Sequence, residues 1–519
     1  MNKFRLILTL VSAVPAVAAA TVAVGANNPL NDLFALGQAG GDTPAHVPAI
    51  NGKENLRTTP VVKCGPGSRK EPTVDGRVPQ GSASKGLNCN IKLIGHQGTE
   101  GGFKVFRYTD SHGHVCAFYD QTLLLPLNAL NPGAGSEGVA VLDMSNPAHP
   151  KLTDTLTTAP MLSPHESLNL NARRGLLAAV NGNPATYPGF VSVYDVHNDC
   201  RHPVLDANGP YARFGHESGF SSDGKTFYAT STALQAITAI DLTDPKHPHA
   251  VWQGNVYSHG MSLSPNGNRA YIADPGFANP GHHQGSLLIL DTSQIQARKA
   301  NPHAREISRL TWPSVSIPQN AIPFTEHGKH YLLEIDEYNQ STLNPNGDPD
   351  VVGAARIIDS SNEKKPFIVS DLRLAIDQPK AHHAATQAGD PGTNNAAQGY
   401  AAHYCNVPTP TNPKVVACSF IASGLRVFDI SNLKKPKESA YYVAPPKPRS
   451  ENGETDSDFA MSKPAFVPRR REIWWSDGTS GFYVLRVSKS AWPHASHKKK
   501  KHKHKHASTT GSLQGEDGF

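Results

Sequence analysis

The sequence predicts an all-β fold, a seven-bladed β-propeller whose last blade is closed by an N-terminal strand. Three observations predict it. A short strand that ends in Asp recurs along the chain, a turn rich in Ser, Asn and Pro follows it, and a strand–turn–strand pair precedes it. Four strands in about 45 to 70 residues, repeated, are the signature of a propeller blade.

The recurring strand is rich in β-branched and aromatic residues, as in VAVLD, LLILD and LRVFD. The Asp that ends it is typical of a turn, because its side chain accepts bonds from nearby backbone N–H groups. Seven copies predict seven blades. The residues that end them are Asp143, Asp195, Asp241, Asp291, Asp359 and Asp429, with Arg486 in the last copy.

Closure of the ring is expected from the two ends of the repeat array. The last copy has no strand after it, whereas residues 90–97, NIKLIGHQ, have the pattern of an outer strand. We expect this strand to complete the last blade, which would remove open sheet edges. Wider spacing of the motif places insertions at residues 341–353 and 381–398, in blades five and six.

The domain organisation follows from composition. Residues 1–26 have the basic start and apolar run of a signal peptide, which predicts a secreted or cell-envelope protein. Residues 27–89, rich in Gly, Pro and Ser, predict a flexible N-terminal lead-in, and residues 90–490 the propeller. Residues 491–519 predict a disordered His/Lys-rich tail. No transmembrane segment is expected in the mature chain.

The formal charge of +6 is a property of the tail, since HKKKKHKHKH at residues 497–506 carries six lysines. The rest of the chain has no basic footprint for nucleic acid. We therefore expect a protein, glycan or small-molecule partner, with the tail able to contact anionic surfaces.

Six cysteines in an exported chain predict disulfides, although sequence alone allows fifteen pairings. Cys405 and Cys418 lie on two strands joined by a proline-rich turn, within bridging range. Cys64 with Cys89 would fasten the lead-in, and Cys116 with Cys200 would join neighbouring repeats.

The chain resembles the bacterial exported propellers built on the LVIVD repeat. The resemblance covers residues 90 to 487 and is strongest in AHYCNVPTPTNPKVVACSFIASGLRVFDISNLKKPKESAYY and REIWWSDGTSGFYVLRV. It implies a propeller fold and export, and it implies little about chemistry because the family carries no agreed activity.

Histidines recur where the innermost strand of a blade is expected to begin, at one mouth of the channel. Imidazoles from separate blades, with carboxylates beside them, are typical ligands of copper, zinc or iron. The candidate ligands are His165, Glu166, His216, Glu217, His259 and His403. His382 and His383, on the blade-six insertion, could cap the same mouth.

A structural role is the alternative for these histidines. In WD-repeat propellers a Gly-His pair holds neighbouring strands together, and Gly215-His216 has that form. Ligands should converge on the axis, whereas structural histidines should bond within a blade or to its neighbour. We also expect Trp474 and Trp475 to face opposite sides of a strand, one buried and one outside.

Two function hypotheses remain open. The first is a binding module without enzymatic activity, which recognises its ligand through the insertions of blades five and six. The second is a metal-dependent oxidoreductase that uses the channel-mouth histidines. Inner-strand histidines are also a feature of the selenium-binding proteins, whose bacterial relatives oxidise methanethiol, but no residues are carried over from them. The sequence has no G-x-S-x-G, H-E-x-x-H or phosphate-loop motif, so hydrolytic and nucleotide chemistry have no local support.

Overall fold

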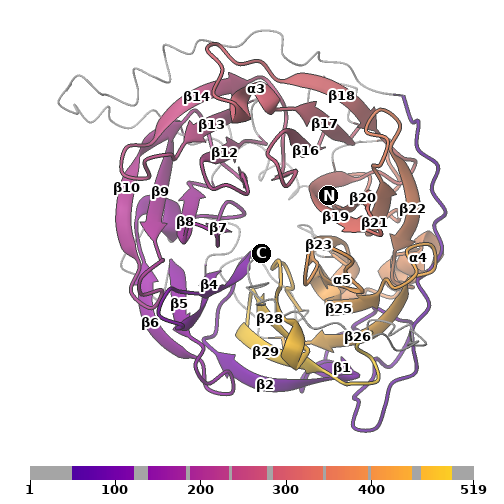
Figure 1. Ribbon diagram of the computed structural model, residues 1–519. Helices are drawn as coiled ribbons and strands as arrows, with labels where there is room; N and C mark the ends of the chain where they lie inside the picture. The colour runs from indigo at the N-terminus through magenta and orange to yellow at the C-terminus, as the bar shows by residue number, and fades with distance from the viewer. Residues whose placement is uncertain are drawn as a thin grey trace, which may run out of the picture.

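The computed structural model describes residues 49–493, except for 122–137, 183–186, 233–235, 277–283, 343–345, 395–398 and 447–457. Seven antiparallel sheets surround a common axis in these residues, so the predicted seven-bladed propeller is confirmed (Figure 1). The predicted signal peptide and most of the tail lie outside the described residues. No helix within the described part is both long and apolar enough to cross a membrane.

Each of blades one to four is built from four consecutive strands. Blade one has β3 (Val105–Thr109), β4 (Val115–Asp120), β5 (Val139–Asp143) and β6 (Lys151–Leu156); blade two has β7 (Asn169–Asn171), β8 (Leu176–Val180), β9 (Gly189–Asp195) and β10 (Val204–Ala212). Blade three has β11 (Ser218–Phe220), β12 (Thr226–Thr230), β13 (Ile237–Asp241) and β14 (His249–Gly254); blade four has β15 (Met261–Leu263), β16 (Arg269–Asp274), β17 (Ser286–Asp291) and β18 (Arg305–Leu310). Short helices α2 (Ala159–Leu162) and α3 (Ser293–Gln296) lie in the connections.

Blade five is also built from four consecutive strands, whereas blades six and seven each take a strand from the N-terminal side. Blade five has β19 (Ile317–Glu326), β20 (Lys329–Glu337), β21 (Ala355–Asp359) and β22 (Phe367–Leu372). Blade six has β23 (Ala402–Asn406), β24 (Val415–Phe420), β25 (Gly424–Asp429) and β26 (Lys437–Val443), and gains a fifth strand, β1 (Leu87–Cys89), from the N-terminal side. Blade seven has β27 (Ala465–Val467), β28 (Glu472–Asp477) and β29 (Gly481–Val487), and β2 (Ile91–Gln97) completes it. The predicted closure is therefore confirmed. Helices α4 (Pro379–Gln387) and α5 (Pro391–Asn394) precede blade six, η2 (Ile421–Ser423) lies within it, and η3 (Pro468–Arg470) lies within blade seven.

The motif strand is the third strand of every blade, and its terminal Asp caps the following turn. Asp143 Oδ1 accepts a bond from the backbone N–H of Ser145 at 2.8 Å, and Asp429 Oδ1 accepts one from Ser431 at 2.8 Å. The four other Asp residues of the motif make the same bond. The turn chemistry inferred from the sequence therefore recurs in six blades, and in blade seven Arg486 pairs with Glu472 instead.

The hydrophobic core lies between the blades. Trp475 packs with residues of blades six and seven, and Trp474 with residues of blades seven and one. Both side chains are fully buried, so the expectation that one lies outside was wrong. Each blade packs a neighbour on both of its faces, and alternation along a strand therefore does not separate core from solvent here.

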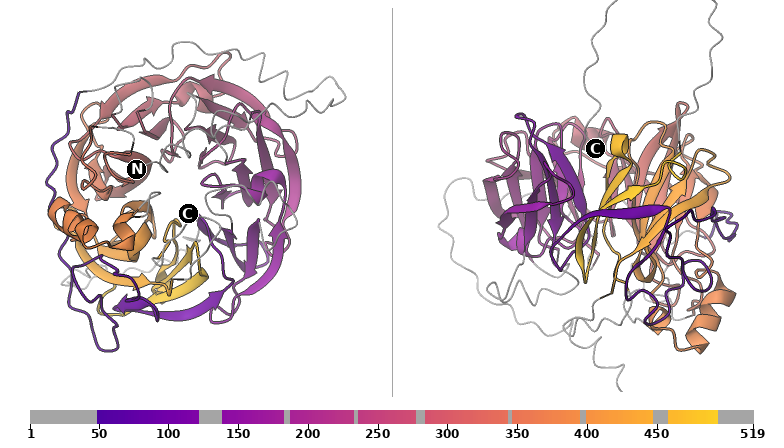
Figure 2. Two further views of the ribbon diagram at one scale, coloured as in Figure 1. Left: turned by 180° about the vertical axis from the view of Figure 1, so that it is seen from behind. Right: turned by 90° about the horizontal axis from the view of Figure 1, so that it is seen from below.

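The lead-in follows the outer edge of the ring from residue 49 onward, seen as the indigo segment at the rim in Figure 2. The backbone of Thr59 bonds Arg373 at 2.8 Å and that of Val62 bonds Glu438 at 2.9 Å. Because β1 joins the sheet of blade six, the folded unit begins before residue 90. The composition of this segment gave no sign of these contacts.

Two buried arginines of the motif strands hold the lead-in. Arg356 of blade five lies 3.2 Å from Glu54 of the lead-in and 3.1 Å from Asp336, and also pairs with Glu334. Arg426, at the same place in blade six, pairs with Glu71 of the lead-in and lies 3.2 Å from Glu438. Blade five thus binds one lead-in carboxylate through its motif strand, and blade six binds two, since Asp75 also lies 3.6 Å from Arg426.

Three disulfides join Cys64 to Cys89, Cys116 to Cys200 and Cys405 to Cys418. All three predicted pairings are confirmed. Cys405 and Cys418 are directly paired across β23 and β24. Three disulfides indicate an oxidising, extracytoplasmic environment.

Candidate metal centre

Each blade brings one residue to the axis at or just before its innermost strand. Two short parallel bridges, Glu166 with Glu217 and Lys104 with Lys463, join neighbouring blades at these points. They identify equivalent positions around the ring. The residue immediately before the equivalent position is, from blade one to blade seven, Phe103, His165, His216, His259, Gln319, His403 and Ser462.

Backbone carbonyls of neighbouring blades orient three of the four histidines. His216 Nδ1 lies 3.0 Å from Gly182 O, His259 Nδ1 3.1 Å from Pro318 O, and His403 Nδ1 2.7 Å from Met461 O. A carbonyl can only accept, so Nδ1 carries the proton and Nε2 of the neutral ring keeps a free lone pair. These contacts are the inter-blade bonds that the structural interpretation predicted.

The Nε2 atoms of the same three histidines meet two carboxylates. Glu166 lies 3.4 Å from His216, 3.3 Å from His259 and 3.1 Å from His403. Glu337 lies 3.4 Å from His259 and 3.3 Å from His403. We call His165, Glu166, His216, His259, Glu337 and His403 the axial cluster. His216, His259 and His403 join neighbouring blades through Nδ1 and converge through Nε2. The structural interpretation therefore describes the Nδ1 side of each imidazole, and the metal-ligand interpretation describes the Nε2 side.

The axial cluster is buried and its hydrogen bonding is incomplete. Glu166 is 1% exposed and His403 is 0% exposed. His403 Nε2 and Glu166 Oε2 have no well-formed hydrogen bond within the described part of the chain. Two overlapping groups could hold a metal ion, with all ligand atoms of a group within 4.8 Å: Glu166 with His165 and His216, and Glu166 with His259 and Glu337.

The charges of the axial cluster are strongly coupled. Burial alone would lower the pKa of His259, but Glu337 and Glu166 outweigh it and raise the pKa to about 9. Burial is likewise outweighed at His403, where the nearby carboxylates of Glu166 and Glu337 raise the pKa to about 10. Burial lowers the pKa of His216 to about 4. Burial would raise the pKa of Glu166, but the histidines hold it well below its usual value.

His165 differs from the other histidines. Its backbone adopts a positive φ of 48°, its side chain is 15% exposed, and its Nδ1 has no hydrogen-bond partner among the described residues. Its ring stacks on Phe103 at 4.3 Å and lies 4.5 Å from the ring of His216. Burial and the neighbouring His216 hold its pKa well below the usual value. It is the most exposed histidine of the cluster and the only one without a backbone anchor.

Glu217 belongs to a second polar layer next to the axial cluster. Its Oε1 accepts bonds from Lys104 and Asn320 at 2.7 Å each and from Tyr404 at 3.0 Å. Gly260 permits this arrangement, since a Cβ there would lie 1.7 Å from Glu217 Oε2. Burial raises the pKa of Glu217. The candidate ligand Glu217 therefore makes its bonds within this layer, and Glu337 lies where the histidines converge.

The other candidate histidines lie at the rim. His382 and His383 are on α4, at the outer edge of the ring in Figure 1. Both bond Asp350 of the blade-five insertion at 2.8 Å, so they join the two insertions and do not cap the axial cluster. A third group of potential ligands, Asp110, His114 and Asp199, lies at the Cys116–Cys200 disulfide, where Arg201 already holds Asp199.

Sequence reasoning missed Glu337, Lys104 and Tyr404. Glu337 ends the second strand of its blade, and a signal for it exists: this strand also ends in an acidic residue in blades one, four and seven. Antiparallel pairing places that end beside the start of the innermost strand, as in the Ile317–Glu337 pair. Lys104 directly follows Phe103, and Tyr404 directly follows His403. Their place beside Glu217 becomes visible only when equivalent positions of the seven blades are compared.

Comparison with known proteins gives few matches in sequence. Residues 134–158 match the family model of the LVIVD repeat. No curated protein matches the chain. Among solved structures, a chain of the hydrazine synthase of Kuenenia stuttgartiensis is similar, with 13% identity, 76% of this chain and 97% of that chain covered, and a TM-score of 0.47. A similarity this low carries no argument about activity. The chain thus contains the LVIVD repeat that the resemblance predicted, and it folds as a seven-bladed propeller.

Proposed function

We propose that the axial cluster binds one transition-metal ion and that the protein is a metal-dependent oxidoreductase. One observation carries the proposal: Nε2 atoms from blades three, four and six converge on two carboxylates within 3.1–3.4 Å. Their Nδ1 atoms are held by backbone carbonyls, as is usual for metal-ligating histidines.

The composition of the cluster fits a divalent ion. With neutral imidazoles, Glu166 and Glu337 give it two negative charges, which one divalent cation balances in a buried site. Imidazole and carboxylate together suit zinc, copper and iron. Copper or iron would supply one-electron chemistry when bound.

His165 gives the proposed site an accessible side. Its ring is the most exposed of the cluster and has no backbone bond to fix it, unlike the rings of His216, His259 and His403. We propose that a substrate approaches the metal from the side of His165. Glu217, Lys104 and Tyr404 form the opposite, closed layer.

Metal content tests the proposal. Elemental analysis should find about one copper or iron per chain in a chain ending at Pro493, which lacks the tail histidines that bind metal adventitiously in the full chain. His216→Ala should remove the metal, and loss of the bond to Gly182 together with the cavity left by the buried ring should cost roughly 2–4 kcal/mol of stability. His382→Ala is the matched control, a buried histidine bonded to Asp350 at the rim, and should keep its metal.

Three outcomes would contradict the proposal. Substoichiometric metal in the chain ending at Pro493 would show that the axial cluster is not a metal site. Full metal in His216→Ala with a lowered melting temperature would make that histidine purely structural. Stoichiometric zinc would show that the axial cluster binds a metal and that the protein is not a redox enzyme of the proposed kind.

A second function is a recognition surface for a protein, glycan or small molecule. The blade-five and blade-six insertions meet through Asp350, whose two carboxylate oxygens each bond one histidine of α4. Irregular segments held on a rigid scaffold are common recognition sites. If the protein proves to bind no metal, recognition through these insertions becomes the favoured function.

A further inference from the structure

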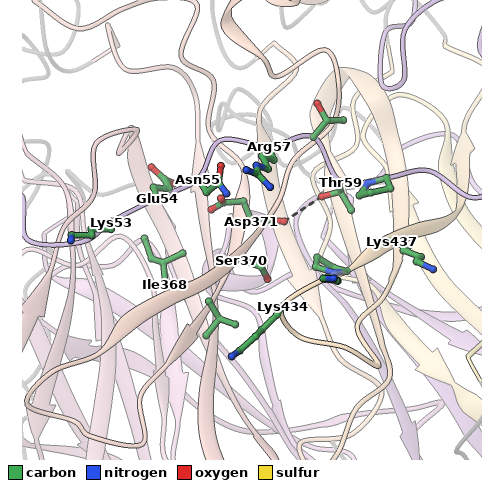
Figure 3. A pocket seen from close by; sticks show the side chains of 15 residues that line it. Lys53, Glu54, Asn55, Arg57, Thr59, Ile368, Ser370, Asp371, Lys434 and Lys437 are labelled. Carbon is green, nitrogen blue, oxygen red and sulfur yellow. Dashed lines mark hydrogen bonds between the residues drawn. The ribbon is translucent and has the colours of Figure 1, made fainter.

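A groove lies on the outer edge of the ring, away from the axial cluster. The lead-in, the outermost strand β22 and the turn before β26 enclose a cavity of about 500 Å³ (Figure 3). Five basic side chains line it: Lys53, Arg57, Lys434, Lys435 and Lys437. We call it the cationic groove. It shares no residue with the axial cluster and is independent of the proposed metal.

The basic residues of the cationic groove have no counter-charge of their own. In the described part of the chain, none of the five makes an ion pair. Of the two carboxylates that line the groove, Glu54 pairs with Arg356, and Asp371 is only 7% exposed, with a pKa that burial raises to about 6. Figure 3 shows the cations spread around Asp371, with Lys53 at one end, Lys437 at the other and Lys434 below. The excess charge stands out because the rest of the chain, without its tail, is near neutral.

The neutral residues of the groove narrow the class of anion. Exposed Asn55 and Thr58 lie between the basic residues and offer hydrogen-bonding groups to a polyhydroxylated ligand. No aromatic ring lines the groove among the described residues, so stacking with nucleic-acid bases has no support. The three disulfides indicate an extracytoplasmic setting, where the abundant polyanions include acidic polysaccharides.

We propose that the cationic groove binds an acidic polysaccharide, with carboxylate or sulfate groups on the lysines and Arg57 and sugar hydroxyls on Asn55 and Thr58. A groove of about 500 Å³ accommodates a few sugar units. The lead-in supplies one wall, so its attachment through Glu54 and Arg356 also shapes the groove.

The test uses the full chain and four probes at physiological salt: polygalacturonate, dextran sulfate, neutral dextran and oligothymidylate. Polygalacturonate or dextran sulfate should bind. The triple variant Lys434→Gln, Lys435→Gln, Lys437→Gln should weaken that binding roughly tenfold or more, since each exposed ion pair contributes little alone. Preference for polygalacturonate or for dextran sulfate distinguishes a uronic-acid from a sulfated ligand.

The matched control is the same turn one blade earlier. Lys364 and Lys365 occupy the positions in blade five that Lys434 and Lys435 occupy in blade six, and all four are exposed. The double variant Lys364→Gln, Lys365→Gln should bind like the unmodified protein. The proposal would be overturned if both variants lost binding equally. It would also be overturned if oligothymidylate or neutral dextran bound as well as the acidic polysaccharides, or if neither acidic polysaccharide bound.

Discussion

Two clusters of buried charge differ in the kind of cation that they contain. At the axis, Glu166 and Glu337 face the imidazoles of His259 and His403. At the rim, Glu54, Glu334 and Asp336 face the guanidinium of Arg356. An arginine keeps its proton under all conditions that a protein meets, whereas an imidazole can release its proton to a competing metal. The rim cluster can therefore only hold the fold together, and the axial cluster can exchange its cation.

Removal of Arg356 should give the largest effect on stability. Arg356→Met would leave three buried carboxyl groups without their cation, and loss of one partner of a buried ion pair costs about 3–5 kcal/mol. Urea unfolding should show this loss. Protein that remains folded should keep its metal, because the axial cluster is untouched.

Arg305→Met is the control for this variant. Arg305 is 80% exposed and lies 3.6 Å from Asp291, so its loss should cost at most about 1 kcal/mol. Equal stability of the two variants would show that the rim cluster does not fasten the lead-in. Loss of metal from folded Arg356→Met would show that the two clusters are coupled.

The pH dependence of stability should be steeper in the metal-free protein than in the metal-loaded protein. The pKa values of His259 and His403 are raised from 6.5 to about 9 and about 10, so their stabilisation is complete below 6.5 and is lost as pH rises through 9 to 10. The lowered pKa of Glu166 adds stability that is lost as pH falls below 4.5. Metal competes with the two imidazole protons, so its affinity should rise with pH, by up to about 100-fold per unit.

Unfolding in urea with a chelator and with saturating metal, at about pH 6 and about pH 9, measures this difference. The metal-free protein should be less stable at the higher pH, and the metal should add more stability there. A metal contribution that does not change with pH would mean that the metal does not replace imidazole protons, and so lies outside the axial cluster.

The sequence predicted those parts of the fold that depend on local chemistry. The Asp143-type turns and the strand before them are local, so repetition alone gave the number of blades. The histidines were found because they recur at one place in the repeat. Glu337 was missed because it comes to the axis from the second strand, and only the antiparallel register places it there.

Two further misses come from packing between distant segments. The prediction for Trp474 and Trp475 assumed a sheet with one wet face, whereas a blade is covered on both. Residues 49–89 have the composition of a flexible lead-in, and their attachment depends on Arg356 and Arg426, which lie roughly 300 residues away or more. Composition cannot report a partner that is so distant in sequence.

The smallest expected effect separates the axial cluster from the polar layer next to it. Tyr404→Phe keeps the ring that lies 4.9 Å from His403 and removes only the hydroxyl bond to Glu217. Glu217 retains Lys104 and Asn320 at 2.7 Å, so the variant should lose about 0.5–1.5 kcal/mol of stability. Its metal affinity, measured by competition with a chelator, should change less than twofold.

A loss of affinity above tenfold in Tyr404→Phe would change the assignment of Glu217. Tyr404 does not contact the convergent Nε2 atoms through its hydroxyl, so its effect on the metal would have to pass through Glu217. Glu217 would then act on the metal together with Glu166, as the sequence suggested. An unchanged affinity would confine the metal to the histidines, Glu166 and Glu337, and would leave the Glu217 layer as the closed wall of the site.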